Sequence, residues 1–585
     1  MSAPAEFVRI GAASGPAFSK DGRTLFHLRG AGLPQVWAMG LDGGDARQLT
    51  AHDEKVAFIR RSPSDDRLFY GIDRGGDERQ QLFLLDTATG ESKALTDAPA
   101  VIHDFGAWSP DGTRIVFAAN DRDEADFDIH VLDVATGERT RVFQGKRQIS
   151  VSGWSPDGAR IALLEDRGYG DAWLHVLDTA SGDVRPIPQP GPTIWQTLRW
   201  SSDGRSLMGL TDHGGSNFLR LCRIDPQSGT VTEVCRAAGR DVEAWVVSPD
   251  QTRLATIEND RGWAVVRLGP TGGERGVVAG LPAGVAADLA FSPDGTRVAL
   301  SASSPTEPPG IWLIEEGASR PVWRPDAAGL DFRPLELVGW ESSDGRQVPG
   351  WLAFPAGAAP PAGWPAVIWV HGGPVGQTRP NFRPDIQMLL AQGFAVLMPN
   401  VRGSSGYGRA SCESDEQEKR LDSVADLAAG ATWLAGRSAI DPKRIGIMGQ
   451  SYGGFMVLSA VTEYPELWRA AVDYYGIADF TTLLAGTGKW RRDHRAAEYG
   501  DNAALFARIS PVHRAERITA PLMVLHGTRD PRVPIGESEQ IVAALRGQGK
   551  PVEYLVFDYA GHGFIRPDDR ARAFEAVAGF FRHYL

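Results

Sequence analysis

The sequence is poor in cysteine and contains no long hydrophobic run. Its three cysteines, Cys222, Cys235 and Cys412, are too few for a disulfide framework and fit a reducing compartment. Cys222 and Cys235 could pair across a hairpin, but two buried thiols are the favoured interpretation. No apolar stretch approaches the about 20 residues of a membrane helix, and the first residues lack the basic segment and apolar core of a signal peptide. We therefore expect a cytoplasmic protein.

Motifs for metals and nucleotides are also missing. No Cys/His cluster has the spacing of zinc ligands and no glycine loop has a phosphate-binding pattern, so the sequence predicts neither a metal site nor a cofactor. The formal net charge of −12 argues against a nucleic-acid partner and an anionic membrane surface. With 585 residues, the chain exceeds what one hydrophobic core usually holds, which predicts two or more domains. The sequence does not decide between a monomer and a homo-oligomer.

A turn motif recurs seven times in the N-terminal half. Each copy has a serine, an aspartate two or three residues later and, in most copies, a glycine that accepts a positive φ. The leading serines, spaced 43 to 47 residues apart, are Ser19, Ser62, Ser109, Ser155, Ser201, Ser248 and Ser292. A fixed period of this length is typical of repeat architectures.

Strand-like segments surround these turns. A second turn, such as Asp133-Val134-Ala135-Thr136-Gly137, closes most repeats. Four short strands in each repeat predict a seven-bladed β-propeller in residues 1–328. The last repeat keeps its own outer strands, at residues 311–314 and 321–323, so no strand from the N-terminus is needed to close the ring.

The pattern changes near Leu330. Apolar runs at residues 366–370 and 394–398 now alternate with helical stretches such as residues 424–434. Alternating strands and helices predict a parallel sheet covered by helices. We therefore expect a second domain, an α/β-hydrolase, in residues 329–585.

A nucleophile-elbow motif lies in this second half. Gly449-Gln450-Ser451-Tyr452-Gly453-Gly454 directly follows the apolar run 445–448. In such a motif a strand turns sharply into a helix, small flanking residues avoid collisions, and the serine oxygen is exposed. In a chain with 68 glycines the bare motif is weak evidence. The rest of a catalytic triad therefore has to be found.

Two further residues complete a triad in the expected chain order. Asp530 follows the predicted strand 521–525, and His562 follows the predicted strand 553–557. His562 would take the proton of the serine, and Asp530 would hold the imidazole and stabilise its charged form. An Asx-turn for Asp530 and a structural loop histidine for His562 are the alternatives. An oxyanion hole is expected from the Tyr452 amide and from the glycine pair Gly372-Gly373, for which a plain turn is the alternative.

Together these motifs make the chain resemble the prolyl oligopeptidase family of serine peptidases, in particular its acylaminoacyl-peptidase branch. The resemblance extends over nearly the whole chain, and Tyr452 stands where the proline-specific endopeptidases usually carry asparagine. It implies that Arg532, two residues after the catalytic aspartate, binds a substrate carbonyl, with a surface ion pair as the alternative. It also implies that Glu78, in a blade-two segment, approaches the substrate.

Arginines recur in the loops between the second and third strands of the predicted blades. All these loops lie on one face of a propeller, opposite the serine–aspartate turns. One hypothesis is that Arg74, Arg122, Arg167 and Arg261 line a chamber between the domains and attract the C-terminal carboxylate of a short peptide. The alternative, that each arginine pairs with an aspartate of its own blade, is favoured.

The leading functional prediction is a serine peptidase for short peptides, with the propeller limiting access. Release of acylated N-terminal residues, of dipeptides or of C-terminal residues and cleavage of internal bonds all stay open. An ester hydrolase and a propeller-based binding scaffold with a secondary hydrolase are the alternatives, and the scaffold predicts a missing triad member. Tyr474, Tyr475 and Trp490 could form an apolar pocket for the residue before the scissile bond, although aromatic core packing is commoner.

Overall fold

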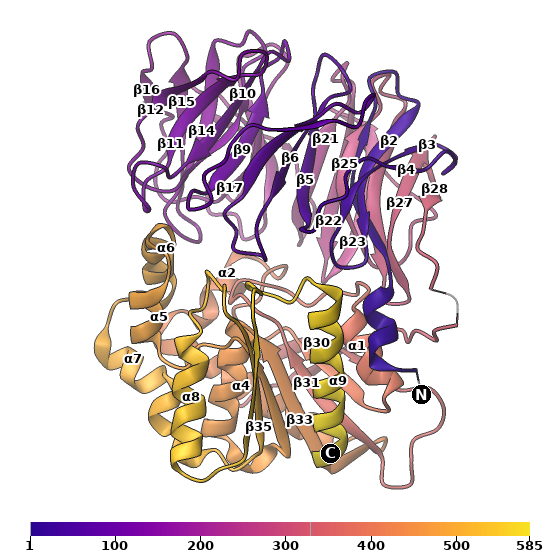
Figure 1. Ribbon diagram of the computed structural model, residues 1–585, viewed down its shortest axis with the longest axis vertical. Coiled ribbons are helices and arrows are strands. Elements are labelled where there is room, and N and C mark those ends of the chain that lie inside the picture. Colours follow the sequence, from indigo (N-terminus) through magenta and orange to yellow (C-terminus); the bar gives the residue numbers. More distant parts are fainter. Residues whose placement is uncertain (1, 328) are drawn as a thin grey trace.

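The structure is a computed structural model that describes residues 2–327 and 329–585. Two domains stack on each other, a β-propeller above and an α/β-hydrolase domain below (Figure 1). Seven four-stranded antiparallel sheets form the propeller, which confirms the predicted seven blades. The predicted boundary at residues 328 and 329 falls between the last propeller strand and the first hydrolase strand.

Each blade uses four consecutive strands. The blades consist of β1 (Ala12–Phe18), β2 (Thr24–Gly30), β3 (Gln35–Gly40) and β4 (Arg47–Gln48); β5 (Val56–Arg61), β6 (Leu68–Ile72), β7 (Gln81–Leu85) and β8 (Ser92–Ala94); β9 (His103–Trp108), β10 (Arg114–Ala119), β11 (Asp128–Asp133) and β12 (Arg139–Phe143); β13 (Ile149–Trp154), β14 (Arg160–Asp166), β15 (Ala172–Asp178) and β16 (Val184–Pro186); β17 (Trp195–Trp200), β18 (Leu207–Thr211), β19 (Arg220–Ile224) and β20 (Val231–Cys235); β21 (Asp241–Val247), β22 (Arg253–Asp260), β23 (Trp263–Pro270) and β24 (Gly276–Val277); and β25 (Val285–Phe291), β26 (Arg297–Ser304), β27 (Glu307–Glu315) and β28 (Ala318–Trp323).

Among the described residues, no strand is exchanged between the first and last blades, as expected from the sequence. Side chains connect them instead. The Arg297 guanidinium donates to the Gly22 carbonyl at 3.3 Å, and that of Arg320 donates to the Leu41 carbonyl at 2.9 Å. The ring therefore closes through these side-chain hydrogen bonds and an apolar core shared by the first and last blades rather than through a shared sheet.

The repeated turns owe their shape to the serine and aspartate of the motif. In the third blade the Ser109 hydroxyl donates to Asp111 at 2.6 Å and accepts the amide of Arg114 at 2.9 Å. Hydrogen bonds from Ser109 and Thr113 lower the pKa of Asp111 to about 2. The turn thus joins the first and second strands of a blade and faces away from the hydrolase domain.

The hydrolase domain contains one eight-stranded sheet of order β29-β30-β32-β31-β33-β34-β35-β36. Its strands are β29 (Glu336–Glu341), β30 (Gln347–Ala353), β31 (Trp364–Val370), β32 (Ala395–Pro399), β33 (Ile440–Gln450), β34 (Ala470–Tyr474), β35 (Leu522–Gly527) and β36 (Val552–Phe557). The last six strands run parallel and the first two antiparallel.

Helices cover both faces of this sheet. They are α1 (Pro384–Ala391), α2 (Arg409–Cys412), α3 (Arg420–Ala435), α4 (Tyr452–Glu463), α5 (Phe480–Gly486), α6 (Lys489–Tyr499), α7 (Ala503–Ile509), α8 (Gly536–Gly547) and α9 (Pro567–Tyr584), with short 3₁₀ turns η1 (Pro4–Arg9), η2 (Glu413–Asp415), η3 (Gln417–Lys419), η4 (Pro465–Leu467) and η5 (Pro511–Arg517). One core joins α3, α4 and α8 to the sheet, and the other joins α1 and α9 to its opposite face.

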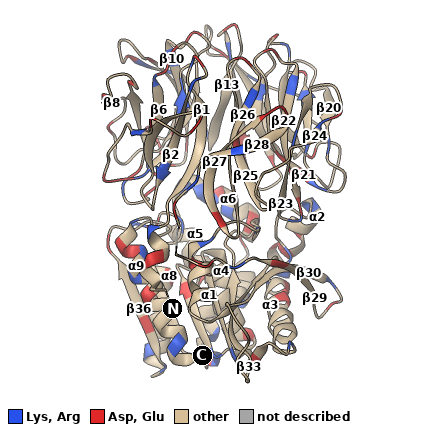
Figure 2. Ribbon diagram, turned by 90° about the vertical axis from the view of Figure 1, so that its right-hand side faces the viewer, with Lys and Arg blue, Asp and Glu red and all other residues tan. Residues whose placement is uncertain are grey.

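The N-terminal segment packs on the hydrolase domain rather than on the propeller. Phe7 and Val8 of η1 are buried in the same core as α1 and α9, and both chain ends lie at the hydrolase domain (Figures 1 and 2). The sequence did not predict this contact. The N-terminal segment and the linker after β28 therefore tie the two domains together at the same side of the molecule.

All three cysteines are buried and free, so Cys222 and Cys235 are two buried thiols, the interpretation favoured from the sequence. Within residues 2–327 and 329–585, no helix is both long and apolar enough to cross a membrane.

Candidate active site

Ser451 lies between the end of β33 and the start of α4. Its backbone has φ 58° and ψ −121°, a conformation rare for a residue with a side chain. The Ser451 amide donates to the Tyr474 carbonyl at 2.9 Å, which ties the turn to the neighbouring strand β34. The local structure is the sharp strand-to-helix turn that the motif predicts.

Close packing explains the glycines around Ser451. A Cβ added to Gly449 would lie 2.3 Å from the Gly453 carbonyl oxygen, and one added to Gly453 would lie 2.3 Å from that of Val370. Both neighbours are backbone atoms, which cannot move aside without shifting a strand. Any larger residue would therefore deform the turn that carries the serine.

Asp530 and His562 meet although 32 residues separate them. His562 Nδ1 lies 2.7 Å from Asp530 Oδ2. The amides of Arg532 and Val533 donate to the other oxygen, Oδ1, at 2.8 and 3.0 Å. Asp530 is thus fixed by its own loop and presents one oxygen to the imidazole.

The surroundings of Asp530 keep it ionised. Burial acts to raise its pKa, but the hydrogen bond from His562 and the nearby imidazole of His526 outweigh this effect, and the pKa lies far below its ordinary value. His526 is fully buried in β35, donates through Nε2 to the Val533 carbonyl at 2.9 Å and lies 3.6 Å from Asp530. His526 was not predicted from the sequence, although its position directly before the Asp530 loop was an available signal.

The Ser451 hydroxyl makes no hydrogen bond with His562 among the described residues. The two are nevertheless linked through Tyr474 and Tyr475: Tyr474 accepts the Ser451 amide, and the Tyr475 ring lies 4.6 Å from the His562 ring. Hydrogen bonds between nucleophile and base often tighten only when substrate binds. The structure therefore brings the predicted triad to one edge of the sheet.

The predicted oxyanion donors lie beside the serine. Tyr452 is the first residue of α4, where backbone amides have no partner within the helix. A Cβ added to Gly372 would lie 3.3 Å from the Ser451 Cβ, so the Gly372–Gly373 loop passes directly over the nucleophile. Burial lowers the pKa of His371, and its ring is held by the Gly372 carbonyl at 2.9 Å and the Ser404 hydroxyl at 3.0 Å.

Arg532 and Glu78 form an ion pair across the domain interface. Glu78 Oε1 lies 2.5 Å from Arg532 Nε, and its other oxygen lies 2.5 Å from Arg491 of α6. The side chain of Arg532 keeps 43% of its surface exposed. Arg491 is a site residue that sequence reasoning missed, because nothing in its helix reveals a partner 413 residues away.

The propeller also supports the loop that carries His562. The Gly561 amide donates to the Gly75 carbonyl at 2.7 Å. A Cβ added to Gly561 would lie 2.2 Å from the Gly76 carbonyl oxygen, so two backbone segments touch directly. The position of the base therefore depends on contact between the domains.

The four predicted propeller arginines fall into two groups. Arg122 pairs with Asp126 and Asp128, and Arg167 pairs with Glu165, all within their own blades. Arg261 is 70% exposed with Asp260 at 3.7 Å, and the Arg74 side chain has no ion pair among the described residues. Attraction of a peptide carboxylate to this group stays a prediction.

One cluster in the described part of the chain could in principle hold a metal ion. It contains Asp121, Asp128 and His130 of the third blade. Arg139 pairs with Asp121 at 2.7 Å, and Arg122 pairs with Asp128 at 3.1 Å. Because these arginines already neutralise the carboxylates, we infer no metal site there.

The aromatic residues suggested for an apolar pocket have packing roles. Tyr474 and Tyr475 are each 5% exposed and belong to the core beneath α1 and α9. Trp490, at the start of α6, is 8% exposed and packs into the core between the third and fourth propeller blades. Trp490 is thus an anchor of α6 on the propeller.

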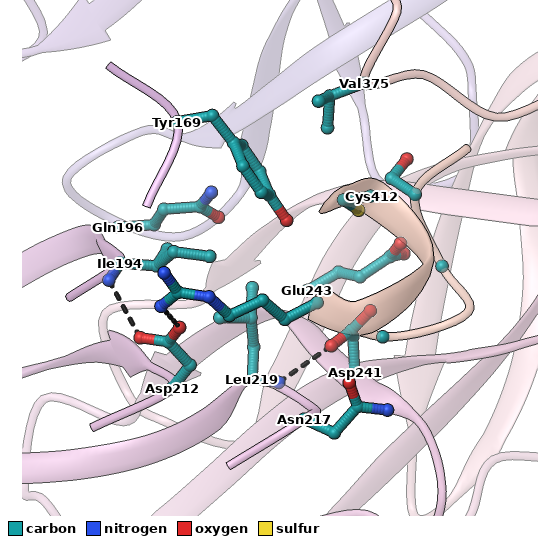
Figure 3. A pocket seen from close by; sticks show the side chains of 14 residues that line it. Tyr169, Ile194, Gln196, Asp212, Asn217, Leu219, Asp241, Glu243, Val375 and Cys412 are labelled. Carbon is teal, nitrogen blue, oxygen red and sulfur yellow. Dashed lines mark hydrogen bonds and ion pairs between the residues drawn. The ribbon is translucent and has the colours of Figure 1, made fainter. Parts of the chain in front are cut away.

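A polar cavity of about 310 Å³ separates the domains next to the oxyanion loop. Arg409 of the hydrolase domain pairs with Asp212 of the propeller at 2.5 Å, and Figure 3 shows Asp212 and Asp241 among the side chains that line this cavity. Burial raises the pKa of the nearby Asp241 to about 6. This part of the interface is therefore held by charges rather than by apolar packing, as is common where domains move.

Comparisons with known proteins agree with this architecture. The family model described as "Prolyl oligopeptidase family" matches residues 380–585. Dipeptidyl aminopeptidase BIII of Pseudoxanthomonas mexicana is 30% identical in an alignment that covers 97% of this chain and 86% of that protein. An acylamino-acid-releasing enzyme of Arabidopsis thaliana is 27% identical over 94% of this chain and 71% of its own.

The fold has solved counterparts. The crystal structure of a puromycin hydrolase superposes with a TM-score of 0.87 at 21% identity and covers all of this chain and 96% of its own. The predicted propeller and hydrolase fold are thereby confirmed. Because dipeptidyl aminopeptidase BIII is 30% identical over 97% of this chain, the chain belongs to the prolyl oligopeptidase family and is a serine-type peptidase.

Proposed function

We propose that the protein hydrolyses short peptides through an acyl-enzyme formed on Ser451. The observation that carries this proposal is the 2.7 Å contact between His562 Nδ1 and Asp530, whose second oxygen is held by two backbone amides. A carboxylate on Nδ1 fixes the tautomer in which Nε2 carries the free electron pair. Nε2 is then the base available to the serine.

The first half of the reaction forms the acyl-enzyme. Ser451 Oγ attacks the scissile carbonyl carbon while His562 Nε2 accepts the hydroxyl proton. The oxyanion receives hydrogen bonds from the Tyr452 amide and an amide of the Gly372–Gly373 loop. The carbon–nitrogen bond then breaks as His562 gives its proton to the leaving amine.

The second half releases the acyl group. Water replaces the amine, His562 accepts a proton from it, and the resulting hydroxide attacks the ester carbon. A second oxyanion forms in the same place and collapses, and His562 returns the proton to Ser451. Asp530 stays ionised throughout and stabilises each imidazolium.

Arg532 and Glu78 would act on the acyl side of the substrate. The half-exposed guanidinium of Arg532 has donors left after Glu78 takes Nε, and these can bind a backbone carbonyl. Glu78, held between Arg532 and Arg491, would orient Arg532 and offer a carboxylate edge to an N-terminal ammonium. One relative is named a dipeptidyl aminopeptidase and another an acylamino-acid-releasing enzyme. The substrate N-terminus is therefore either free or acylated, and experiment has to distinguish the two.

Substrate size would be limited by the propeller. It covers the catalytic edge of the sheet, and its second blade contacts the His562 loop directly. A folded protein cannot bring a peptide bond to Ser451 between these surfaces. The same triad can cleave esters, but an ester hydrolase would need neither this cover nor Arg532.

The test uses short fluorogenic peptides with free and acylated N-termini. The wild type should cleave one of the two series, and Ser451→Ala should lose at least about 10³-fold in kcat/KM on it. Asp530→Asn should lose about 10⁴-fold in kcat, because an asparagine selects the wrong imidazole tautomer. Full peptide hydrolysis by Ser451→Ala would refute the proposal.

A further inference from the structure

A cavity of about 210 Å³ lies beside the triad, between α1, α9 and the catalytic edge of the sheet. Gln450, the residue before Ser451, and Gly563, the residue after His562, both line it, and Tyr474 and Tyr475 contribute further walls. The cavity is therefore adjacent along the chain to both the nucleophile and the base. No residue of the predicted triad, the oxyanion hole or the Arg532–Glu78 pair lines it.

The charged side chains around this cavity are not balanced. Arg383 pairs with Asp385 through two contacts of 3.2 and 2.7 Å and stacks on Trp369 at 3.7 Å. Arg570, in the first turns of α9, makes no ion pair or side-chain hydrogen bond with any described residue. Its guanidinium carbon lies 5.8 Å from the centre of the Phe574 ring. The lining thus carries one unmatched positive charge.

Arg570 is partly buried as well as unpaired. Burial lowers the pKa of its guanidinium, and the charge of Asp385 compensates only in part. A cation shielded from water in this way gains stability when an anion reaches it. The side-chain amide of Gln450 likewise has no hydrogen-bond partner in the described residues, so it offers a second donor at the same wall.

The position of the cavity suggests which part of a substrate it receives. Arg532 and Arg491 of α6, which both pair with Glu78, lie toward one side of the triad, whereas α9 stands on the other side of the domain (Figure 1). If the acyl part of the peptide extends toward Arg532, the chain beyond the scissile bond leaves past His562. It then meets Gly563 and the cavity.

We propose that this cavity is the leaving-group subsite and that Arg570 binds a carboxylate in it, with Gln450 as a second donor. The proposal rests on the acyl-transfer function proposed above. The carboxylate has two sources in a short peptide: the free C-terminus of the leaving group or an acidic side chain within it. Arg570 of the hydrolase domain, rather than the propeller arginines, then sets a preference for such substrates.

The experiment compares matched peptides that share one acyl part cleaved by the wild type. The leaving groups are Ala-Ala as the free acid, Ala-Ala amide, Ala-Glu amide and Ala-Gln amide, with products quantified by chromatography. A charge-assisted hydrogen bond predicts about a tenfold higher kcat/KM for a carboxylate-bearing peptide than for its uncharged counterpart. A preference for the free acid identifies the C-terminus as the ligand, and a preference for Glu over Gln identifies the side chain.

Variants connect the preference to Arg570. Arg570→Gln should bring the ratio close to one, and Arg570→Lys should keep more of it because the charge remains. Arg572→Gln is the matched control, since Arg572 lies on the same helix, is exposed and contacts Val556 and Phe557 outside the cavity. It should retain the wild-type ratio.

Three results would overturn the inference: no preference in the wild type, a preference that survives Arg570→Gln, or one that disappears in Arg74→Gln or Arg261→Gln instead. Failure of the proposed function looks different. In that case Ser451→Ala would cleave all four peptides as fast as the wild type, and the proposed subsite would be refuted together with the proposed function.

Discussion

In the proposed function the Arg532 guanidinium binds two partners, Glu78 and a backbone carbonyl of the substrate. Lysine cannot satisfy both, because it lacks the planar arrangement of donors. The pair also joins the two domains at the point where a substrate would enter. The contribution of Arg532 should therefore appear in substrate binding more than in the chemical step.

We predict that Arg532→Gln raises KM about tenfold on the preferred short peptide and changes kcat much less. The lost interaction is a charge-assisted hydrogen bond to a carbonyl that is made equally in the ground and transition states. Steady-state kinetics measure the effect. Arg236→Gln, which removes an arginine 66% exposed on the propeller rim, should change neither constant; an unchanged KM in Arg532→Gln would assign that residue a purely structural role.

Asp473 is a second residue with an unusual environment. It is fully buried at β34, and neither carboxylate oxygen has a hydrogen-bond partner among the described residues. A Cβ added to Gly454 or to Gly476 would lie 2.3 Å from Oδ1, so the group is wedged between two backbone segments. Burial raises its pKa from 3.8 to about 7, with a smaller opposing effect of His526.

This shift predicts how the stability of the protein depends on pH. The unfolded chain loses the Asp473 proton near pH 4, but the folded chain keeps it until about pH 7. Between these values the unfolded state binds fewer protons, so rising pH costs stability, by about 4 kcal/mol at most. Asp473→Asn should remove this loss: its unfolding temperature, compared with the wild type, should rise between pH 5 and pH 8. A constant difference across this range would contradict the assignment.

At the scale of elements, the junction of β33 and α4 has no spare volume. Gly453 opposes the carbonyl oxygens of Val370 and His371, at 2.3 and 2.7 Å from an added Cβ. Gly579, inside α9, has nothing within 4 Å of the same position. The two glycines therefore make a matched pair, one required by packing and one replaceable.

We predict opposite effects for Gly453→Ala and Gly579→Ala. The first should destabilise the protein by about 1–3 kcal/mol through overpacking and reduce activity, because the turn carrying Ser451 has to shift. The second should stabilise it by about 0.5–1 kcal/mol, because alanine favours a helix over glycine. Denaturant unfolding and peptide hydrolysis measure both. A tolerated alanine at residue 453 would mean that the elbow is less tightly packed than described.

At the scale of the whole molecule, the contacts between the domains differ from one side to the other. The N-terminal segment and the linker after β28 connect the domains covalently at α1 and α9. The opposite side is held by α6, through Trp490 and ion pairs such as Arg147–Asp493 and Arg491–Glu78. Opening of the molecule to admit a peptide is therefore expected at α6.

A disulfide across this side tests the expectation. A Cβ added to Gly168 would lie 3.0 Å from the Ala497 Cβ. Cysteines at these two positions can therefore form a disulfide once their Cβ atoms move slightly apart. The oxidised Gly168→Cys/Ala497→Cys variant should hydrolyse a ten-residue peptide at least about tenfold more slowly than its reduced form. Gly168→Cys alone is the control, because its φ of +143° carries a backbone cost without a bridge. Equal rates before and after reduction would place the entrance elsewhere.

The sequence predicted the parts of this molecule that follow from local patterns. Seven turn motifs were enough for seven blades, and chain order led to Asp530 and His562, which lie 2.7 Å apart in the structure. Contacts between distant segments could not be predicted in this way. Arg491 reaches Glu78 and Trp490 reaches the propeller core only because α6 rises from the hydrolase domain, and Arg570 faces a cavity whose other walls lie far away in the sequence.

The central claim is that Ser451 is the nucleophile, activated by His562. An organofluorophosphonate reports this directly, because the activated serine oxygen displaces fluoride from phosphorus and forms a stable ester. Intact-mass measurement followed by peptide mapping should find one adduct, on Ser451, with labelling abolished in Ser451→Ala and slowed at least about 10³-fold in His562→Ala. An adduct on another residue, or undiminished labelling of Ser451→Ala, would contradict the account.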